Sequence, residues 1–418
     1  EFRVRVAQAL AAYNADKGVP EDWAVPRDVR ARIRSEIGAA MFAAEYGRVP
    51  EDARELHGHI AKLSRPQTTA VAGYDLTFSP VKSVSALWAL AEPGTAASIE
   101  RAHQAAVADA LRFIETHALF TRTGPKAARQ VDVRGLVATA FTHRDSRAGD
   151  PDLHTHVAVA NKVQTMDGRW LSIDGRVLFK AAVAASEVYN TALEQHLTAT
   201  LPVRFAERTR ADRGKRPVRE LVGVDETLLD RWSARRASIE ARRSELAVAF
   251  QADHGRPPTT VESFRLAQQA TLETRQSKHA PRALPDQRRI WRAEADAVLG
   301  IDGVQRMLNA ALGHSRRQPY TEVTQPWVQE QARGIVETME GSRSTWQDWH
   351  VRAEALRVVR ATNVSERRTP ETVARLVHAA LGRSVRLSRP ETGVREPLPL
   401  RRADGSSVYT RHDTTTYT

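Results

Sequence analysis

The sequence contains no cysteine, which excludes disulfide bonds and thiolate metal sites. Any metal ion would therefore be held by His, Asp or Glu side chains. The chain also lacks an uninterrupted apolar run of about eighteen residues, the minimum for a membrane-spanning helix. Its start, Glu1-Phe2-Arg3, has no signal-peptide pattern. These absences predict a soluble, cytoplasmic protein with no membrane insertion.

Basic residues outnumber acidic ones, 62 to 50, giving a net charge of +12. This excess predicts attraction to a polyanion, either nucleic acid or an anionic membrane surface. The 418 residues can bury a sizeable core and predict roughly two to four domains. The chain is thus long enough for an enzyme.

The first part of the chain, residues 1–66, has the apolar spacing of helices. Residues 72–79 alternate instead, with Tyr74 and Leu76 on one face, which predicts a half-buried strand with a polar open face. Ser79 as N-cap and Pro80 as first helical residue then predict a helix.

Two further strands are predicted over residues 131–143 and 153–163, joined by a polar turn and paired antiparallel. Asp167-Gly168 predicts a tight hairpin, and residues 177–201 have the pattern of a long amphipathic helix. The fold class is therefore predicted as α+β, an antiparallel sheet covered by helices.

Beyond residue 201 the composition becomes basic, and helices rich in paired arginines follow. Residues 300–345 are weakly patterned and could hold a linker, whereas 345–359 and 369–381 predict helices. The last stretch, 398–418, alternates as strands do. The predicted division is 1–66, a helical N-terminal part; 67–202, a core with the candidate site; 203–300, a basic helical extension; and 301–418, a linker and the start of another domain.

The strongest chemical candidate is a set of three histidines, His143, His154 and His156. Residues two apart on a strand point the same way, so His154 and His156 present both imidazoles to one face. Cross-strand pairing can bring His143 beside them. Three neutral imidazoles form a divalent-cation site with open coordination positions, which suit a phosphate oxygen and an attacking oxygen.

Other interpretations fit the same residues. His57 and His59 repeat the His-x-His spacing in a helical context without a third partner, and we interpret them as structural. Three histidines alone would also fit a small-molecule metal hydrolase, a cupin-like site, or a DNA-binding module with a structural histidine cluster. Spacing does not choose among these.

Two longer motifs distinguish among these interpretations. They are GYDLTFSPVKS at residues 73–83 and HRDSRAGDPDLHTH at residues 143–156. Together they resemble the paired motifs of TrwC- and TraI-like relaxases, the MobF class of HUH endonucleases. The resemblance is strong over about residues 65–205 and looser in the flanks, which resemble actinobacterial TraA-type members.

The resemblance implies site residues. His143, His154 and His156 match the family's metal ligands, for Mg, Mn or Zn, and Asp75 matches the acidic residue that supports them. Lys82, Arg144 and Arg147 are candidates for contact with DNA phosphates. The implied partners are single-stranded DNA at the origin of transfer and other relaxosome and type IV secretion proteins.

The resemblance also implies a reaction, in which a tyrosine hydroxyl attacks the scissile phosphodiester at the transfer origin. The products are a 5'-phosphotyrosine adduct and a free 3'-hydroxyl. The family's tyrosines lie near the extreme N-terminus, so the nucleophile is expected before residue 1 and the chain is expected not to nick alone.

The rest of the chain fits the same resemblance. Residues 404–410 resemble the lead-in to a helicase half, and the sequence contains no Gly-x-x-x-x-Gly-Lys-Ser/Thr phosphate-binding loop, so no ATPase activity is expected from these residues. The basic extension is expected to clamp single-stranded DNA, with Trp232 as a candidate for base stacking.

Overall fold

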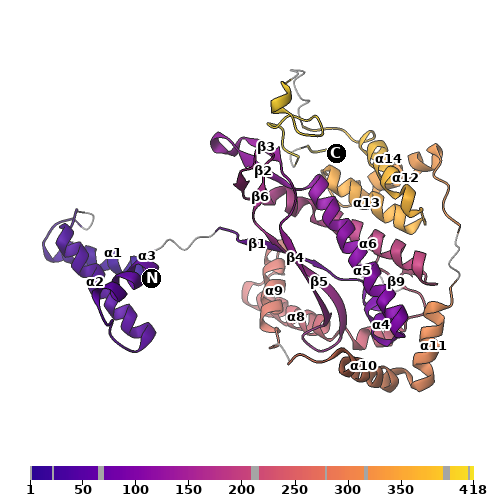
Figure 1. Cartoon of the computed structure of the whole chain (residues 1–418), viewed down its shortest axis with the longest axis horizontal. Helices are drawn as coiled ribbons and strands as arrows, with labels where there is room; N and C mark the ends of the chain where they lie inside the picture. The colour runs from indigo at the N-terminus through magenta and orange to yellow at the C-terminus, as the bar shows by residue number, and fades with distance from the viewer. Residues whose placement is uncertain are drawn as a thin grey trace. The chain divides into compact units, whose positions relative to one another are not determined.

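The computed structural model describes residues 2–20, 23–64, 70–208, 216–277, 280–314, 319–388, 396–412 and 415–418. Two compact units make up the chain, residues 1–71 and residues 72–418 (Figure 1). Each unit has its own packing and is described by itself. Within the described residues, no helix has the length and apolar character needed to cross a membrane.

The first unit is helical, as predicted, with α1 (Phe2–Asp16), α2 (Arg27–Tyr46) and α3 (Ala53–Ser64). His59 is 5% exposed, and its ring lies 5.2 Å from the ring of Phe42 and 5.8 Å from that of Tyr46, between centroids. His57 is exposed on the same helix. The surroundings of His59 are those of a packed aromatic side chain, in agreement with the structural interpretation of His59.

The second unit is built on a three-stranded antiparallel sheet in the order β1 (Gly73–Phe78), β5 (Pro151–Ala160), β4 (Ala138–Asp145). The predicted strand over 131–143 was wrong in extent. Its first part is β3 (Arg129–Asp132), which pairs with β2 (Phe120–Thr123) in a separate ribbon. Gly135 has φ 136°, a backbone conformation that interrupts a regular strand, and β4 begins after it.

Three helices pack on the sheet: α4 (Lys82–Leu90), α5 (Pro93–His117) and α6 (Gly175–Thr200) (Figure 1). The alternation of β5 buries Leu153, Val157 and Val159 among them, each at most 2% exposed. The predicted α+β class, an antiparallel sheet covered by helices, is confirmed. Helix α4 begins two residues later than predicted because Val81 remains extended, at φ −60° and ψ 154°.

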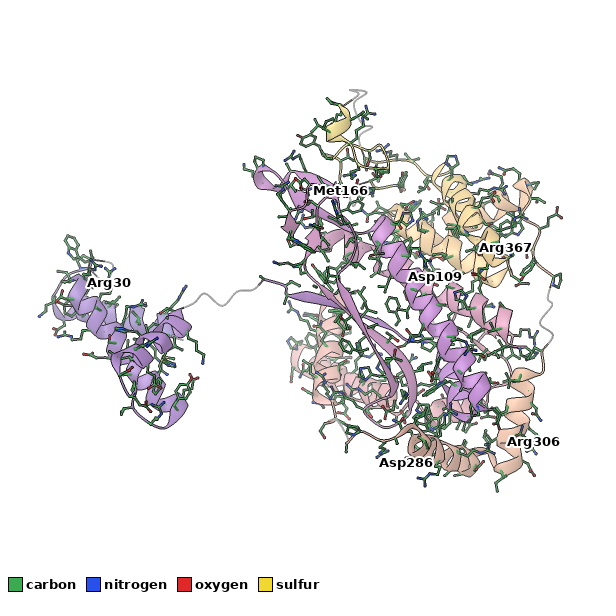
Figure 2. The ribbon with its side chains drawn as sticks, viewed as in Figure 1. Arg30, Asp109, Met166, Asp286, Arg306 and Arg367 are labelled. Atoms are coloured by element: carbon green, nitrogen blue, oxygen red, sulfur yellow. The ribbon has the colours of Figure 1, made fainter. Side chains whose placement is uncertain are left out.

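The predicted hairpin after the third strand is present. β6 (Val163–Gln164) and β7 (Trp170–Leu171) pair across a turn in which Gly168 has φ 89°. Met166 marks this exposed turn (Figure 2). A second hairpin joins β8 (Phe205–Glu207) to β9 (Arg219–Leu221), and residues 209–215 of the basic run lie outside the described residues.

Helices make up most of the remaining chain. They are α7 (Glu226–Arg231), α8 (Ala234–His254), α9 (Thr260–Glu273), α10 (Leu284–Leu299), α11 (Ile301–Leu312), α12 (Gln325–Glu340), α13 (Asp348–Ala361) and α14 (Thr369–Leu381). The two helices predicted over 345–359 and 369–381 correspond to α13 and α14. In the described part of the weakly patterned stretch 300–345, the structure has α11 and α12.

The strand pattern predicted over 398–418 is largely absent in the described part of that stretch, which has a 3-10 turn (Leu398–Leu400) and isolated bridges. Tyr417 bridges to Trp346 and Arg386, so the terminal residues join the second hydrophobic core, which lies among α12, α13 and α14.

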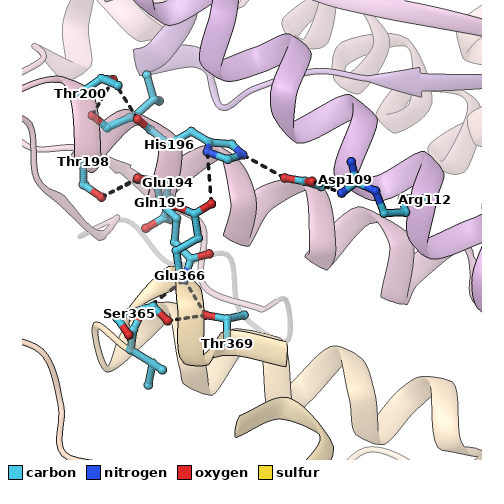
Figure 3. A network of polar contacts seen from close by, with 12 residues as sticks. Asp109, Arg112, Glu194, Gln195, His196, Thr198, Thr200, Ser365, Glu366 and Thr369 are labelled. Carbon is cyan, nitrogen blue, oxygen red and sulfur yellow. Dashed lines mark hydrogen bonds and ion pairs between the residues drawn. The ribbon is translucent and has the colours of Figure 1, made fainter. Parts of the chain in front are cut away.

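Helix α6 connects this second core to the first. His196 of α6 lies 2.9 Å from Asp109 of α5 and 3.8 Å from Glu366, measured between ring nitrogens and carboxylate oxygens (Figure 3). The neighbouring Gln195 donates from Nε2 to Thr369 Oγ1 at 2.7 Å. Polar contacts of α6 therefore reach both the sheet-covering helices and the C-terminal helices.

Candidate metal centre

The three predicted histidines lie together on the open face of the sheet. His143 of β4 is directly opposite His154 of β5, and His156 follows two residues later on the same face. Ring centroids are 5.2 Å apart for His143 and His154, 5.4 Å for His143 and His156, and 5.2 Å for His154 and His156. Strand alternation and register therefore produce the cluster.

Hydrogen bonds fix the protonated nitrogen of two of these rings. His154 Nδ1 lies 2.7 Å from the carbonyl oxygen of Asp152, and a carbonyl can only accept, so Nδ1 carries the proton. His156 Nδ1 lies 2.9 Å from both carboxylate oxygens of Asp75, which leads to the same assignment. In each neutral ring the lone pair is then on Nε2, the nitrogen available to a metal ion.

The spacing of the rings fits a shared ion. With nitrogen–metal distances of about 2.1 Å, three imidazoles on one ion place their centroids roughly 5 Å apart. In the described residues, no group of three or more His, Asp or Glu side chains already has the full arrangement of a metal site. Binding of one ion by all three rings would therefore require a change in their side-chain torsions.

Asp75 lies on β1, beside β5, with its side chain 60% exposed, while that of His156 is 33% exposed. Thr77 Oγ1 lies 3.1 Å from the same ring nitrogen of His156. A carboxylate that accepts from the outer nitrogen of a ligand imidazole orients the ring and raises its basicity. The position of Asp75 is compatible with the supporting role that the sequence resemblance implies.

The predicted DNA-contacting residues differ in their surroundings. Lys82 Nζ donates to the carbonyl of Pro151 at 3.0 Å and lies 3.5 Å from Asp152, so it is next to the strand that carries His154. Arg147 donates to the carbonyl of Gln276 at 2.9 Å. Arg144 is exposed and has no side-chain hydrogen bond or ion pair within the described residues. Contact of these three residues with DNA stays a prediction.

The turn between the two histidine-bearing strands is held by the helical extension, a feature that the sequence did not indicate. Trp291 Nε1 of α10 donates to the carbonyl of Gly149 at 2.8 Å, and Gln287 Nε2 donates to Asp145 at 2.8 Å. Asp150 accepts from the backbone of Ala234 at 3.2 Å, and burial raises the pKa of its carboxyl group. Helices α8 and α10 therefore restrain the turn through these hydrogen bonds.

A fully buried histidine behind the sheet was also missed. His103 of α5 is 0% exposed, with Nδ1 2.8 Å from Tyr189 Oη and Nε2 2.8 Å from Thr155 Oγ1. Burial lowers the pKa of His103 to about 4, with a smaller contribution from the charge of His154, so the ring is neutral near pH 7. The available sequence signal was a histidine on the apolar face of a helix.

One prediction about an aromatic residue has a clear outcome. Trp232 is 0% exposed and donates from Nε1 to Glu294 at 2.8 Å, so the prediction that it stacks on bases was wrong. Tyr189 is 2% exposed, and Tyr74 is partly buried and packs against the core.

With this geometry in place, comparison with known proteins is decisive for the family. The family model described as TrwC relaxase matches residues 5–298. The chain belongs to the TrwC relaxase family. This membership confirms the resemblance of the two motifs.

Relatives of this TrwC-family chain include the multifunctional conjugation protein TraI of Escherichia coli, 30% identical over 361 residues. The match covers 77% of this chain and 19% of that protein. TraI of Escherichia coli strain K12 is 30% identical over 198 residues, covering 44% of this chain and 11% of that protein. The chain therefore spans about a fifth or less of the length of these curated relatives.

Solved structures similar to this TrwC-family chain include the conjugative relaxase TrwC in complex with oriT DNA. For a copper-bound form the TM-score is 0.45 with 28% identity, covering 62% of this chain and 85% of that one. For a metal-free form the TM-score is 0.45 with 25% identity, covering 71% and 95%.

Proposed function

We propose that this chain is the relaxase core of a conjugative DNA-transfer protein, which nicks one strand at the transfer origin with the help of a divalent metal ion. The observation that carries the proposal is the cluster of His143, His154 and His156 on the open face of the sheet. Membership of the TrwC relaxase family supports it.

The proposed reaction is a transesterification. A tyrosine hydroxyl oxygen bonds to the scissile phosphorus as the bond from phosphorus to the 3'-oxygen breaks. The tyrosine hydroxyl gives up its proton and the leaving 3'-oxygen gains one, so that the net products are a free 3'-hydroxyl and a 5'-phosphotyrosine. A bound Mg, Mn or Zn ion would polarise the phosphate and stabilise the charge on its oxygens. The proposal assigns the nucleophile to no residue of this chain.

The residues of this chain would hold and orient the reacting groups. His154 and His156 would present Nε2 to the ion, because their Nδ1 protons are engaged by Asp152 and Asp75. Lys82, beside the His154 strand, would add positive charge near the phosphate. The proposed domain roles follow the sequence: residues 67–202 as catalytic core, 203–300 as DNA clamp and 301–418 as the start of the helicase half.

The test is binding of the chain to labelled single-stranded hairpin oligonucleotides, with and without divalent metal. We expect tight, salt-sensitive binding of DNA and stoichiometric metal uptake. A variant with His154→Ala and His156→Ala should lose metal uptake. The matched control is His57→Ala, which removes an exposed histidine of the other His-x-His pair and should change neither property.

Two outcomes would overturn the proposal. Metal uptake without any DNA binding would favour a metal hydrolase of small molecules. DNA binding that persists while the natural chain takes up no metal would favour a binding module with a structural histidine cluster.

A further inference from the structure

Two threonines lie behind the histidine cluster, on the helix-covered face of the sheet. Thr155 separates His154 from His156 on β5, and Thr142 precedes His143 on β4. The two threonines are directly opposite each other in the β4–β5 register, with their Oγ1 atoms 3.0 Å apart. Successive side chains on a strand alternate between its two faces. A constraint on this threonine pair therefore also constrains the backbone that carries the neighbouring histidines on the open face.

This pair belongs to a continuous hydrogen-bonded chain that reaches two helices. Thr155 Oγ1 meets His103 Nε2 of α5, and His103 Nδ1 meets Tyr189 Oη of α6, both at 2.8 Å. Gln104 Nε2 donates to Thr142 Oγ1 at 2.8 Å. Thr155 and His103 are 0% exposed and Tyr189 is 2% exposed, so no bulk solvent competes for these groups.

The direction of the protons follows from the need to satisfy the buried hydroxyl of Tyr189. If Tyr189 donates to His103 Nδ1, then Nε2 carries the ring proton and donates to Thr155. Thr155 can in turn donate to Thr142, whose own hydroxyl proton can point to water because Thr142 is exposed. The opposite direction would leave the Tyr189 proton buried without a partner among these groups.

We propose that His103 is a positioning residue for the metal centre. Its Nε2–H donates a hydrogen bond to Thr155, and this bond fixes the position and orientation of β5 relative to α5, so that the rings of His154 and His156 can converge with that of His143. This inference rests on the proposed function, because it assumes that the three histidines bind an ion. It assigns to His103 no contact with metal or DNA.

Physical requirements favour this role. Ligand nitrogens must converge to within a few tenths of an ångström, and the rings can rotate into place only if the backbone beneath them is fixed. The open face supplies little packing for this purpose, since the His143 side chain lies on an exposed strand. The hydrogen-bonded chain from Tyr189 to Thr142, which is buried as far as Thr155, connects α5, α6, β4 and β5 at the strand position between His154 and His156.

The decisive experiment compares His103→Gln with His103→Asn. The amide nitrogen of Gln can take the place of Nε2 and still donate to Thr155, whereas Asn reaches only the Nδ1 position beside Tyr189. Both variants lose the imidazole and should lose similar thermal stability. We expect His103→Asn to weaken Co²⁺ binding by about 10-fold or more and to alter the visible absorption of bound Co²⁺, with His103→Gln within about threefold of the natural chain.

A second variant, Thr155→Val, removes the acceptor on the strand without altering α5, and should weaken Co²⁺ binding like His103→Asn. Its matched control is Thr191→Val, the same change at a buried threonine of α6 that belongs to no part of this chain of hydrogen bonds. Circular dichroism establishes folding for each variant, and calorimetric titration gives the affinity.

Equal Co²⁺ affinity in the natural chain, His103→Asn and Thr155→Val would overturn the positioning role while leaving the metal site intact. Equal weakening in Thr191→Val and Thr155→Val would also overturn it, because a general loss of stability would then explain the effect. Failure of the natural chain to bind Co²⁺ would remove the metal site, and this inference with it.

Discussion

The two faces of the β1–β5–β4 sheet have opposite characters along the same ten residues of β5. On the helix side, Leu153 and Val157 are 1% exposed and belong to the main core. On the open side, the His156 side chain is 33% exposed and its partner Asp75 is 60% exposed. Strand alternation thus places the core residues on one face of the sheet and the candidate metal ligands on the other. A one-residue shift in register would exchange the two sets of side chains.

The edge strand differs from the central one. Seven of the eight residues of β4 are exposed, and this strand is held by its pairing with β5 and by hydrogen bonds from Gln104 to Thr142 and from Gln287 to Asp145. The central strand is fixed from behind by packing, by the Thr155–His103 hydrogen bond, and at its start by the turn that α10 restrains. The position of His143 consequently depends on β5, which makes β5 the strand whose variants are most informative.

The largest expected effect is a difference in the free energy of unfolding between substitutions on the two faces of the sheet. Leu153→Ala should lower the free energy of unfolding by about 2–5 kcal/mol, because it leaves a cavity in the core. His156→Ala, measured without metal, should lower it by less than about 1 kcal/mol, because that side chain is partly exposed. Urea unfolding followed by circular dichroism in EDTA gives both values, and equal losses would contradict the division between the faces.

A second prediction concerns affinity on the open face. Asp75→Asn removes the negative charge beside His156 while keeping an amide of similar size. We expect metal affinity to fall roughly 10- to 100-fold, with the stability of the metal-free chain nearly unchanged. Titration calorimetry with Co²⁺ measures the change, and Asp52→Asn, an exposed carboxylate of the first unit, is the control. Unaltered affinity would show that Asp75 does not support the site.

A third prediction concerns the buried face and pH. The pKa of His103 is about 4 in the folded chain because burial disfavours its charged form, against about 6.5 when unfolded. Below pH 6.5 the unfolded chain therefore binds more protons, so stability falls as pH decreases towards 4. Between pH 6.5 and 5 the loss from this residue should be about 2 kcal/mol at most. His103→Gln should remove this part of the acid sensitivity, as urea unfolding at both pH values would reveal.

Local patterns in the sequence were sufficient to predict the histidine cluster on the open face of the sheet. The alternation of residues 153–160 placed His154 and His156 together, and antiparallel pairing across a short turn brought His143 opposite them. Positions of α13 and α14 also followed from local apolar spacing and end signals. These features depend on neighbours close in sequence, which a single chain reveals.

Contacts between distant segments could not be predicted in this way. His103 meets Thr155 across 52 residues, and Trp291 meets Gly149 across 142. Trp232 was taken for a surface aromatic because its segment is basic, yet the fold buries it against Glu294 of α10. Burial of a polar or aromatic side chain is a property of the tertiary packing, which the local sequence pattern around His103 or Trp232 does not determine.

The smallest expected effect tests whether the open face extends towards DNA beyond the histidines. Arg144 is exposed beside His143, whereas Arg147 donates to the carbonyl of Gln276. If Arg144 contacts a phosphate, Arg144→Ala should reduce the slope of log affinity against log salt by about one. Arg147→Ala should change this slope by less than Arg144→Ala does, because the Arg147 guanidinium is already hydrogen-bonded within the chain. Binding to a hairpin oligonucleotide at several salt concentrations measures both slopes, and a larger change for Arg147 would place the phosphate path over the turn instead of along β4.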